Sequence, residues 1–337
     1  MKRVEDVGSI GFANMWDGKH LKKDHQEKRE QQTETFRRIM ERLSEDKSDE
    51  ELLAGFRRQE KRTGIVMATS PTHIYHGDSV VAELKEVTMK DFYANVTLAD
   101  SAKDVVDFVS TKTSFARWNV VGQPVELHYA QGKLERAIAL RQPDGKGYDV
   151  THTMRHTARM PAQIPAQGTL VVHGVVTITW AHFNDVKKYD GTEYGHPSNL
   201  VKKCVFNLDG RICTTHFMEF IAHHLYTDVH GESKSRLYAQ LNELGFDTCP
   251  IWHFKDFIHE KQVALIEKQY PELRCEYPTE GHVFECDLPC PAAQEKEKDE
   301  PSGRQIIREW SKELDIKERI FINRLFADVF GMPIQTH

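Results

Sequence analysis

The sequence lacks the features that mark membrane-spanning and secreted proteins. No apolar run approaches the about 20 residues that cross a bilayer, and the opening, MKRVEDVGSIGF, has no signal-peptide pattern. The six cysteines include no CxxC pair, which favours a reducing compartment over a disulfide framework. Acidic residues outnumber basic ones, 51 to 45, so an electropositive nucleic-acid binder is not indicated, although a local basic face remains open. We expect a cytoplasmic protein without a membrane partner.

The length of 337 residues, with 39% hydrophobic and 28% charged residues, fits two or three globular domains. Residues 1–66 form a charged region with two helical patterns. Leu21–Leu43 carries a narrow apolar stripe, and Ser48–Arg62 opens with a capping box of Ser48 and Glu51. These patterns predict an N-terminal helical arm that packs on the body of the protein or on a partner.

Residues 67–291 are predicted as a core of strands and turns. Val125–Tyr129 and Leu134–Leu140 alternate around Gln131-Gly132, which is typical of a hairpin. Further strands are expected at 169–180, 211–226 and 281–286, and a helix at 234–244 before Gly245. Residues 292–303 are a polar linker, and residues 304–337 are predicted as C-terminal amphipathic helices, over 306–330. The fold class is α+β, with antiparallel sheets between two helical arms.

Seven segments follow one another in a familiar order: SPT at 70–72, TLADSAKDVVDFV at 97–109, VELHYAQGKLERAIALRQPDGKGYDVT at 125–151, TLVVHGVVTITWAHFNDV at 169–186, HPSNLVKKCVFNLDGR at 196–211, LYAQLNELGFDTCP at 237–250 and YPTEGHVFECD at 277–287. In this order they resemble the adenylation domain of NAD-dependent DNA ligases over about residues 68–288. The resemblance implies an ATP-grasp-like nucleotidyltransferase core.

Such ligases attack NAD with the lysine of a KxDG motif and form a lysine–AMP intermediate. The alignment places Asn119-Val120-Val121-Gly122 on this motif, and an asparagine amide cannot form the phosphoramidate. The other family positions that differ are Val121 for an aspartate, Val175 for a glutamate, Ser198 and Phe206 for two arginines, and Glu285 for a lysine. Glu285 would place a negative charge where a phosphate binds. We interpret the chain as a catalytically degenerate pseudo-ligase with no cofactor and with weak or no NAD binding.

Several basic residues are candidates for phosphate contacts. Arg141 is the catalytic-type position that the resemblance keeps. Arg141 and Lys146 both lie in the segment RQPDGKG, which is either a phosphate-binding loop or a tight turn between strands. Lys187, Lys188, Lys202 and Lys203 form basic pairs near the side that approaches DNA in a ligase. A solvated face is the alternative explanation for these pairs.

No metal site is predicted. His152 and His156 are four residues apart but have no third ligand nearby, and His223-His224 lies on a strand where neighbours point to opposite faces. The group Cys275, His282, Cys286 and Cys290 does not have a two-plus-two zinc spacing.

Three functions remain open. The first is a non-catalytic protein that binds DNA or assists a separate ligase subunit. The second is a protein-interaction module that uses the helical arms, for example a bacteriophage inhibitor of a host factor. The third is an active NAD-dependent ligase subunit that uses another lysine, with Lys112 the nearest candidate, or that is completed by a partner. The expected location is the cytoplasm of a bacterial or phage-infected host cell.

Overall fold

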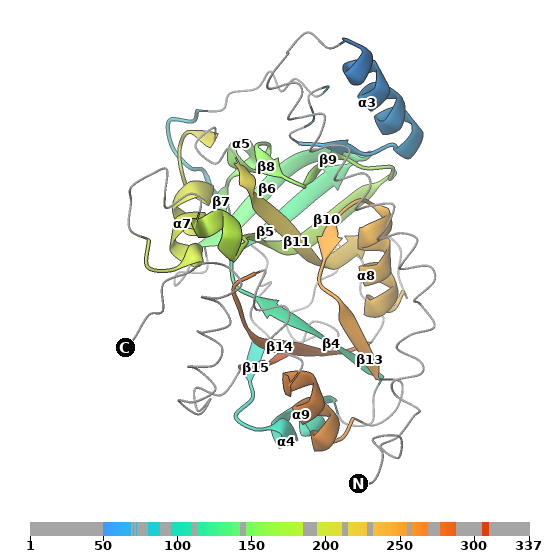
Figure 1. Ribbon diagram of the computed structural model, residues 1–337, viewed down its shortest axis with the longest axis vertical. Coiled ribbons are helices and arrows are strands. Elements are labelled where there is room, and N and C mark those ends of the chain that lie inside the picture. The colour runs from blue at the N-terminus through green and yellow to red at the C-terminus, as the bar shows by residue number, and fades with distance from the viewer. Residues whose placement is uncertain are drawn as a thin grey trace.

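The computed structural model describes residues 50–68, 70, 72, 80–87, 96–109, 113–141, 146–184, 194–210, 215–227, 232–254, 258–268, 277–287 and 305–309. These residues build two sheets, one above the other in the orientation of Figure 1. Within the described part, no helix is long and apolar enough to cross a membrane.

The larger sheet has a continuous path of seven strands. In spatial order these are β1 (Val66–Met67), β9 (Pro161–Gln163), β6 (Lys133–Arg141), β5 (Gln123–Ala130), β10 (Thr169–Ile178), β11 (Thr215–Thr227) and β12 (Asp247–Thr248). Three more strands join it: β7 (Lys146–Asp149) pairs with β6, β2 (Glu86–Val87) pairs with β7, and β8 (Thr157–Ala158) pairs with β11. All pairs are antiparallel except those of β11 with β8 and β12.

Helices flank the larger sheet (Figure 1). They are α3 (Glu50–Thr63), α5 (Thr151–Met154), α7 (Pro197–Val205) and α8 (Lys234–Glu243). α7 packs against β10 and β5, and α8 packs against β11. Leu200, Val201, Leu237 and Leu241 are the apolar side chains that these two helices bury in the main core.

The smaller sheet has the order β13 (Ile251–Phe254), β4 (Ser114–Val120), β14 (Thr279–Cys286), β15 (Gln305–Glu309) and β3 (Val96–Leu98). Its helices are α4 (Ala102–Val109) and α9 (Glu260–Lys268). A second apolar cluster lies there, with Val105, Trp118, Trp252, Val263 and Phe284 among its members. Each sheet therefore has its own hydrophobic core.

The predicted hairpin is confirmed as β5 and β6. Gln131 and Gly132 have φ angles of 48° and 76°, which is the positive-φ pair of a two-residue hairpin turn. A Cβ at Gly132 would lie 2.3 Å from the carbonyl oxygen of Ile164, so the position requires glycine for space as well as for conformation. The strands predicted at 169–180, 211–226 and 281–286 are present as β10, β11 and β14, and α8 matches the predicted helix before Gly245.

The arms are only partly described. α3 lies within the predicted N-terminal helical region, but residues 1–49 and 310–337 lie outside the described residues. The prediction of a helix from Ile306 is wrong at its start, because 305–309 forms β15 between β14 and β3. As a strand, this segment pairs its backbone with β14 on one side and with β3 on the other. These backbone hydrogen bonds favour a strand more than the weak helical spacing of the apolar residues favours a helix. Residues 305–309, which follow the predicted polar linker at 292–303, are thus part of the smaller sheet.

Candidate nucleotide site

A site forms where the chain passes from the smaller sheet to the larger one. β4 ends at Val120, and the turn Val121-Gly122 leads into β5. The hydroxyl of Thr177 donates a hydrogen bond to the carbonyl oxygen of Val121 at 2.8 Å, which ties the turn to β10. A Cβ at Gly122 would lie 2.1 Å from the carbonyl oxygen of Val176, so only glycine fits here. This explains why the glycine of the KxDG position is kept.

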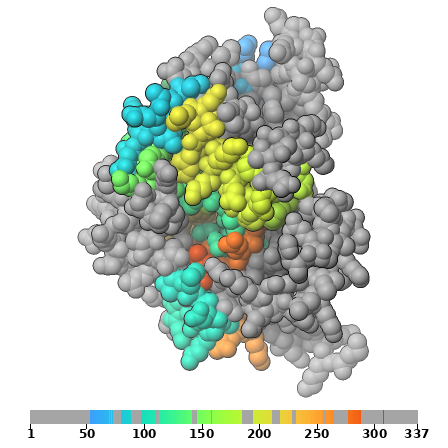
Figure 2. Space-filling model, turned by 90° about the vertical axis from the view of Figure 1, so that its left-hand side faces the viewer, coloured from blue at the N-terminus to red at the C-terminus, as the bar shows by residue number. Residues whose placement is uncertain are grey.

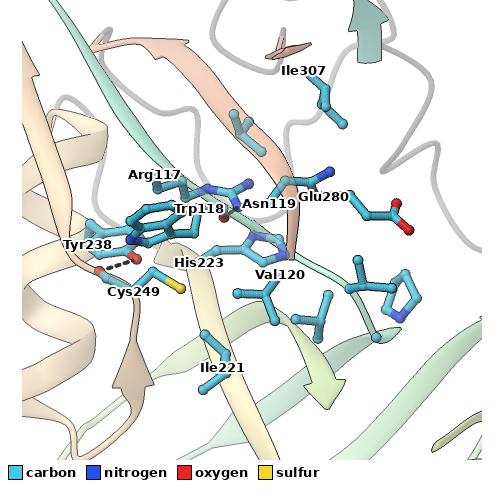
Figure 3. Close-up of a pocket in the computed structure, with 15 residues that line it drawn as sticks. Arg117, Trp118, Asn119, Val120, Ile221, His223, Tyr238, Cys249, Glu280 and Ile307 are labelled. Carbon is cyan, nitrogen blue, oxygen red and sulfur yellow. Dashed lines mark hydrogen bonds between the residues drawn. The ribbon is translucent and has the colours of Figure 1, made fainter. Parts of the chain in front are cut away.

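The first of two pockets at this turn, the inner pocket, has a volume of about 220 Å³. It lies between the two sheets, and Figure 3 shows its side chains converging from β4, β11, β14 and α8. Its lining residues are Arg117, Trp118, Asn119, Val120, Val121, Gly122, Pro124, Val175, Ile221, His223, Tyr238, Cys249, Glu280, Val283 and Ile307. Most of these residues are apolar, and the charged or polar groups of Arg117, Asn119, His223 and Glu280 lie among them.

The second pocket, the outer pocket, has a volume of about 260 Å³ and shares Gly122 and Pro124 with the inner one. Its other lining residues are Gln123, Leu140, Ser198, Asn199 and Lys202. Three of these lie on α7, which begins after an N-cap formed by the His196 imidazole, whose Nδ1 accepts from the Ser198 backbone amide at 3.2 Å. Figure 2 shows the face that carries α7, in yellow-green.

A buried charge cluster closes the inner side of the site. Glu285 of β14 accepts from Arg117 Nε at 3.1 Å and from Lys234 Nζ at 2.9 Å, and His224 Nε2 lies 3.3 Å from its carboxylate. Burial alone would raise the pKa of Glu285, but Lys234, His224 and Arg117 outweigh it and lower the pKa to about 2. The cluster joins both sheets and α8, because Lys234 begins α8 and His224 lies on β11.

The two histidines of the site are held neutral. Burial lowers the pKa of His224 to about 3, although the negative charge of Glu285 acts to raise it. Burial, and then the charge of Arg117, lower the pKa of His223 well below its usual value. The two rings lie 5.8 Å apart at 86° on successive residues of β11. The register of β11 against β10 shifts between His224 and Ala222, so regular alternation is interrupted at His223. The prediction that the two rings point to opposite faces is therefore not supported by their short separation.

The structure separates the positions at which the chain differs from the ligase motifs. Asn119, Val121 and Val175 line the inner pocket, and Ser198 lines the outer one. Phe206 lies in neither lining and packs edge-on against Tyr148, with ring centroids 6.3 Å apart. Glu285 is fully buried, and its charge is compensated by two cations rather than presented to a phosphate.

The predicted basic residues that the structure describes have different surroundings. Lys146 pairs with Glu86 at 2.8 Å on the surface, and its backbone pairs with that of Arg141, as expected for a turn between strands. Lys202 lines the outer pocket, whereas Lys203 donates to the Tyr194 hydroxyl at 2.7 Å. Lys187 and Lys188 lie outside the described residues, as does Lys112.

No metal centre is seen among the residues that the structure describes. The imidazole of His152 is buried and lies 2.9 Å from the carbonyl oxygen of Asn207. Cys275 and Cys290 lie outside the described ranges, so the absence of a metal stays a prediction.

Arg117 and Lys234 were missed by sequence reasoning. Arg117 lies two residues before Asn119 and therefore on the same face of β4, which was the available signal. Nothing local indicated that its partner lies 168 residues away on β14.

The sequence profile of the NAD-dependent DNA ligase adenylation domain matches residues 79–287, which is more than half of the chain. The chain belongs to this family. The prediction that it is not an enzyme is thereby contradicted, because the matched family is the adenylation domain of an enzyme, a DNA ligase.

Among solved structures, one titled "Pmar-Lig_PreS3" is 13% identical, with a TM-score of 0.39, over 64% of this chain and 46% of the other. An RNA ligase of Naegleria gruberi is 9% identical, with a TM-score of 0.33, over 68% and 58%. The ATP-dependent DNA ligase of bacteriophage T7, in complex with ATP, is 11% identical, with a TM-score of 0.32, over 65% and 70%. The alignment with the first of these spans less than half of that protein's length. No curated protein matches the sequence.

Proposed function

We propose that this chain takes part in ligase-type nucleotidyl transfer to nucleic acid, with a nucleotide in the inner pocket and the polynucleotide along α7. The observation that supports this most is the pair of pockets on either side of the β4–β5 turn, where the KxDG motif of the family falls. A base in the inner pocket directs its phosphates past Gly122 toward Lys202 in the outer pocket. Backbone phosphates are the main targets of exposed lysines in nucleic-acid binding.

The covalent step cannot use residue 119. The amide nitrogen of Asn119 is not a nucleophile, because its lone pair is delocalised into the carbonyl group. Nucleotidyl transfer by this chain therefore uses an amine at another position, either a different lysine of the chain or one from a partner subunit. Valine replaces both carboxylates of the family at 121 and 175, and we propose that NAD is bound weakly and is not the nucleotide used.

Intact-mass analysis after incubation with magnesium and NAD, ATP or GTP tests the covalent part. Because residue 119 is asparagine, we expect peptide sequencing to map any nucleotidyl adduct to a lysine at another position. An adduct on the peptide segment 114–123, which contains the aligned motif and no lysine, would contradict this proposal. A tight complex with unmodified NAD, in the low micromolar range, would contradict the proposed weak binding.

Fluorescence anisotropy with nicked, intact and single-stranded DNA tests the nucleic-acid part. We expect salt-sensitive binding that Lys202→Glu weakens. The matched control is Lys103→Glu on α4, an exposed lysine on a helix at the other end of the molecule (Figure 1). Equal loss in both variants would show a nonspecific charge effect, and no binding at low salt would overturn the polynucleotide assignment.

The protein-interaction alternative gains no support from the described residues. Most of both arms lies outside them, and the described parts, α3 and β15, contact the body of the chain.

A further inference from the structure

Arg117 offers hydrogen-bond donors to the inner pocket. Its side chain is 8% exposed and forms part of the pocket lining. Nε donates to Glu285, and Nη1 donates to the carbonyl oxygen of Trp118 at 3.3 Å. A guanidinium carries five N–H donors, so three remain without a partner among the described residues. Figure 3 shows this guanidinium at the centre of the lining, close to Asn119 and His223.

The charge around Arg117 also favours an electron-rich ligand. Arg117 and Lys234 carry two positive charges, and Glu285 supplies one negative charge between them. The neighbouring His223 and His224 are neutral, because burial lowers their pKa values. The buried cluster thus keeps one positive charge in excess. A buried charge that is not fully neutralised raises the free energy of the folded protein. Hydrogen-bond acceptors of a ligand placed against Arg117 would offset this penalty.

The shape of the pocket limits what these acceptors belong to. Val175, Ile221 and Val283 provide aliphatic walls, which suit the faces of a planar ring. Glu280 is exposed and also lines the pocket, where its carboxylate can accept hydrogen bonds. A matching ligand is therefore planar, with two adjacent acceptors on one edge and donors on another.

We propose that the inner pocket binds the guanine base of a free nucleotide, with Arg117 donating to guanine O6 and N7 and Glu280 accepting from the base donors N1 and N2. Arginine is the side chain that most often reads the O6/N7 edge of guanine in a bidentate way. Adenine is disfavoured, because its N6 amino group would face the donors of Arg117. This inference rests on the proposed function and names the nucleotide that the site uses.

Calorimetric titration of the full chain with GMP and AMP tests the inference. A bidentate arginine pair discriminates bases strongly, so we expect GMP to bind at least about tenfold more tightly than AMP. Arg117→Lys keeps the charge and loses the planar fork. It should bring the two affinities to within about twofold of each other, while the midpoint of urea unfolding changes little. The matched control is Arg136→Lys on β6, whose Nε pairs with Asp149 at 3.2 Å away from both pockets, and this variant should keep the preference.

A second variant tests recognition through the size of the pocket. Val175→Phe narrows the inner pocket without altering any charge, and we expect it to weaken GMP binding at least about tenfold. AMP binding equal to or tighter than that of GMP would overturn the inference, as would a full preference in Arg117→Lys. Displacement of bound GMP by an oligonucleotide with a terminal guanosine, but not by one with a terminal adenosine, would also overturn the assignment to a free nucleotide. If DNA binding through Lys202 persists while the guanine preference is absent, only this inference fails; if both are absent, the proposed function fails with it.

Discussion

Glu285 is a buried carboxylate whose charge is matched from three sides, by Arg117, Lys234 and the dipolar ring of His224. Replacing Glu285 with glutamine would leave two buried cations without their anion. We predict that Glu285→Gln lowers the free energy of unfolding by about 3–5 kcal/mol, the usual cost of breaking a buried pair. Urea unfolding followed by circular dichroism measures this change.

The comparison for this variant is Glu86→Gln, which removes the half-exposed pair with Lys146. An exposed pair contributes about 0–1 kcal/mol, so this change should be small. If the two substitutions had similar effects, the charge at Glu285 would not be important for stability. The result would then indicate that water or a counter-ion reaches the cluster.

The buried histidines predict a loss of stability in acid. The pKa values of His224 and His282 are lowered from 6.5 to about 3 by burial, so between these values the unfolded chain binds more protons than the folded one. Stability is therefore full above pH 6.5 and falls as the pH drops toward 3. Glu285, with its pKa lowered from 4.5 to about 2, adds a further loss below pH 4.5.

This prediction is checked by the urea midpoint measured from pH 7.5 to 4.5. His282 packs against Trp118 and Trp252, with ring centroids 4.7 Å and 5.7 Å away. His282→Phe keeps an aromatic ring there and removes the titration, so the decline between pH 6.5 and 4.5 should become shallower. An unchanged slope would show that this ring does not contribute to acid unfolding.

For single residues, the family resemblance located the substituted motif positions but did not show what surrounds them in the fold. Asn119, Val121 and Val175 do line one pocket. The position of Glu285 was known from its segment, yet the interpretation that it opposes a phosphate failed to anticipate the cations that surround it. Long-range partners such as Lys234 leave no periodic signal in a single sequence.

The β4–β5 turn is the element on which both pockets depend, because Gly122 lines each of them. Gly122→Ala would place a methyl group against the carbonyl oxygen of Val176 and push the turn away from β10. We predict a destabilisation of about 1–3 kcal/mol, as in other overpacked sites, together with weaker nucleotide binding. Thermal unfolding and the GMP titration measure both effects.

Gly195→Ala is the matched control for Gly122→Ala. Gly195 is exposed, and a Cβ there would meet no atom within 4 Å. Its unfolding temperature should stay close to that of the unmodified chain. A similar fall in the unfolding temperature of both variants would show that the effect of Gly122→Ala comes from backbone flexibility and not from the close approach of β10.

Elements with strong local signals were predictable and the others were not. The β5–β6 hairpin has both alternation and a turn pair, and α8 has a leucine stripe that ends at Gly245. β15 has only a short isoleucine pair, and its state is set by the edges of β14 and β3. The two-sheet arrangement and the inner pocket depend on such long-range pairings, so the sequence alone supports them only through the family resemblance.

At the scale of the whole molecule, residues 305–309 belong to the folded body. A chain that ends at residue 287 lacks β15, and the backbone groups of β14 and β3 that pair with it lose their partners. We predict that this truncation unfolds the smaller sheet and exposes Trp118 and Trp252, which a shift of tryptophan fluorescence would report. Cutting an engineered protease site within 292–303 is the control, because the C-terminal piece can stay bound as β15. Release of that piece on gel filtration would contradict the structural role of β15.

The pairing of β3 with β15 also bears on how the chain is made. β3 is among the first described strands to leave the ribosome, yet its parallel partner β15 emerges only after all the other described strands. The larger sheet, rich in hairpin contacts between near neighbours, can form while translation continues, whereas the smaller sheet has to wait. The nucleotide pocket lies between the two, so a nascent chain cannot hold its ligand until the last described strand is in place.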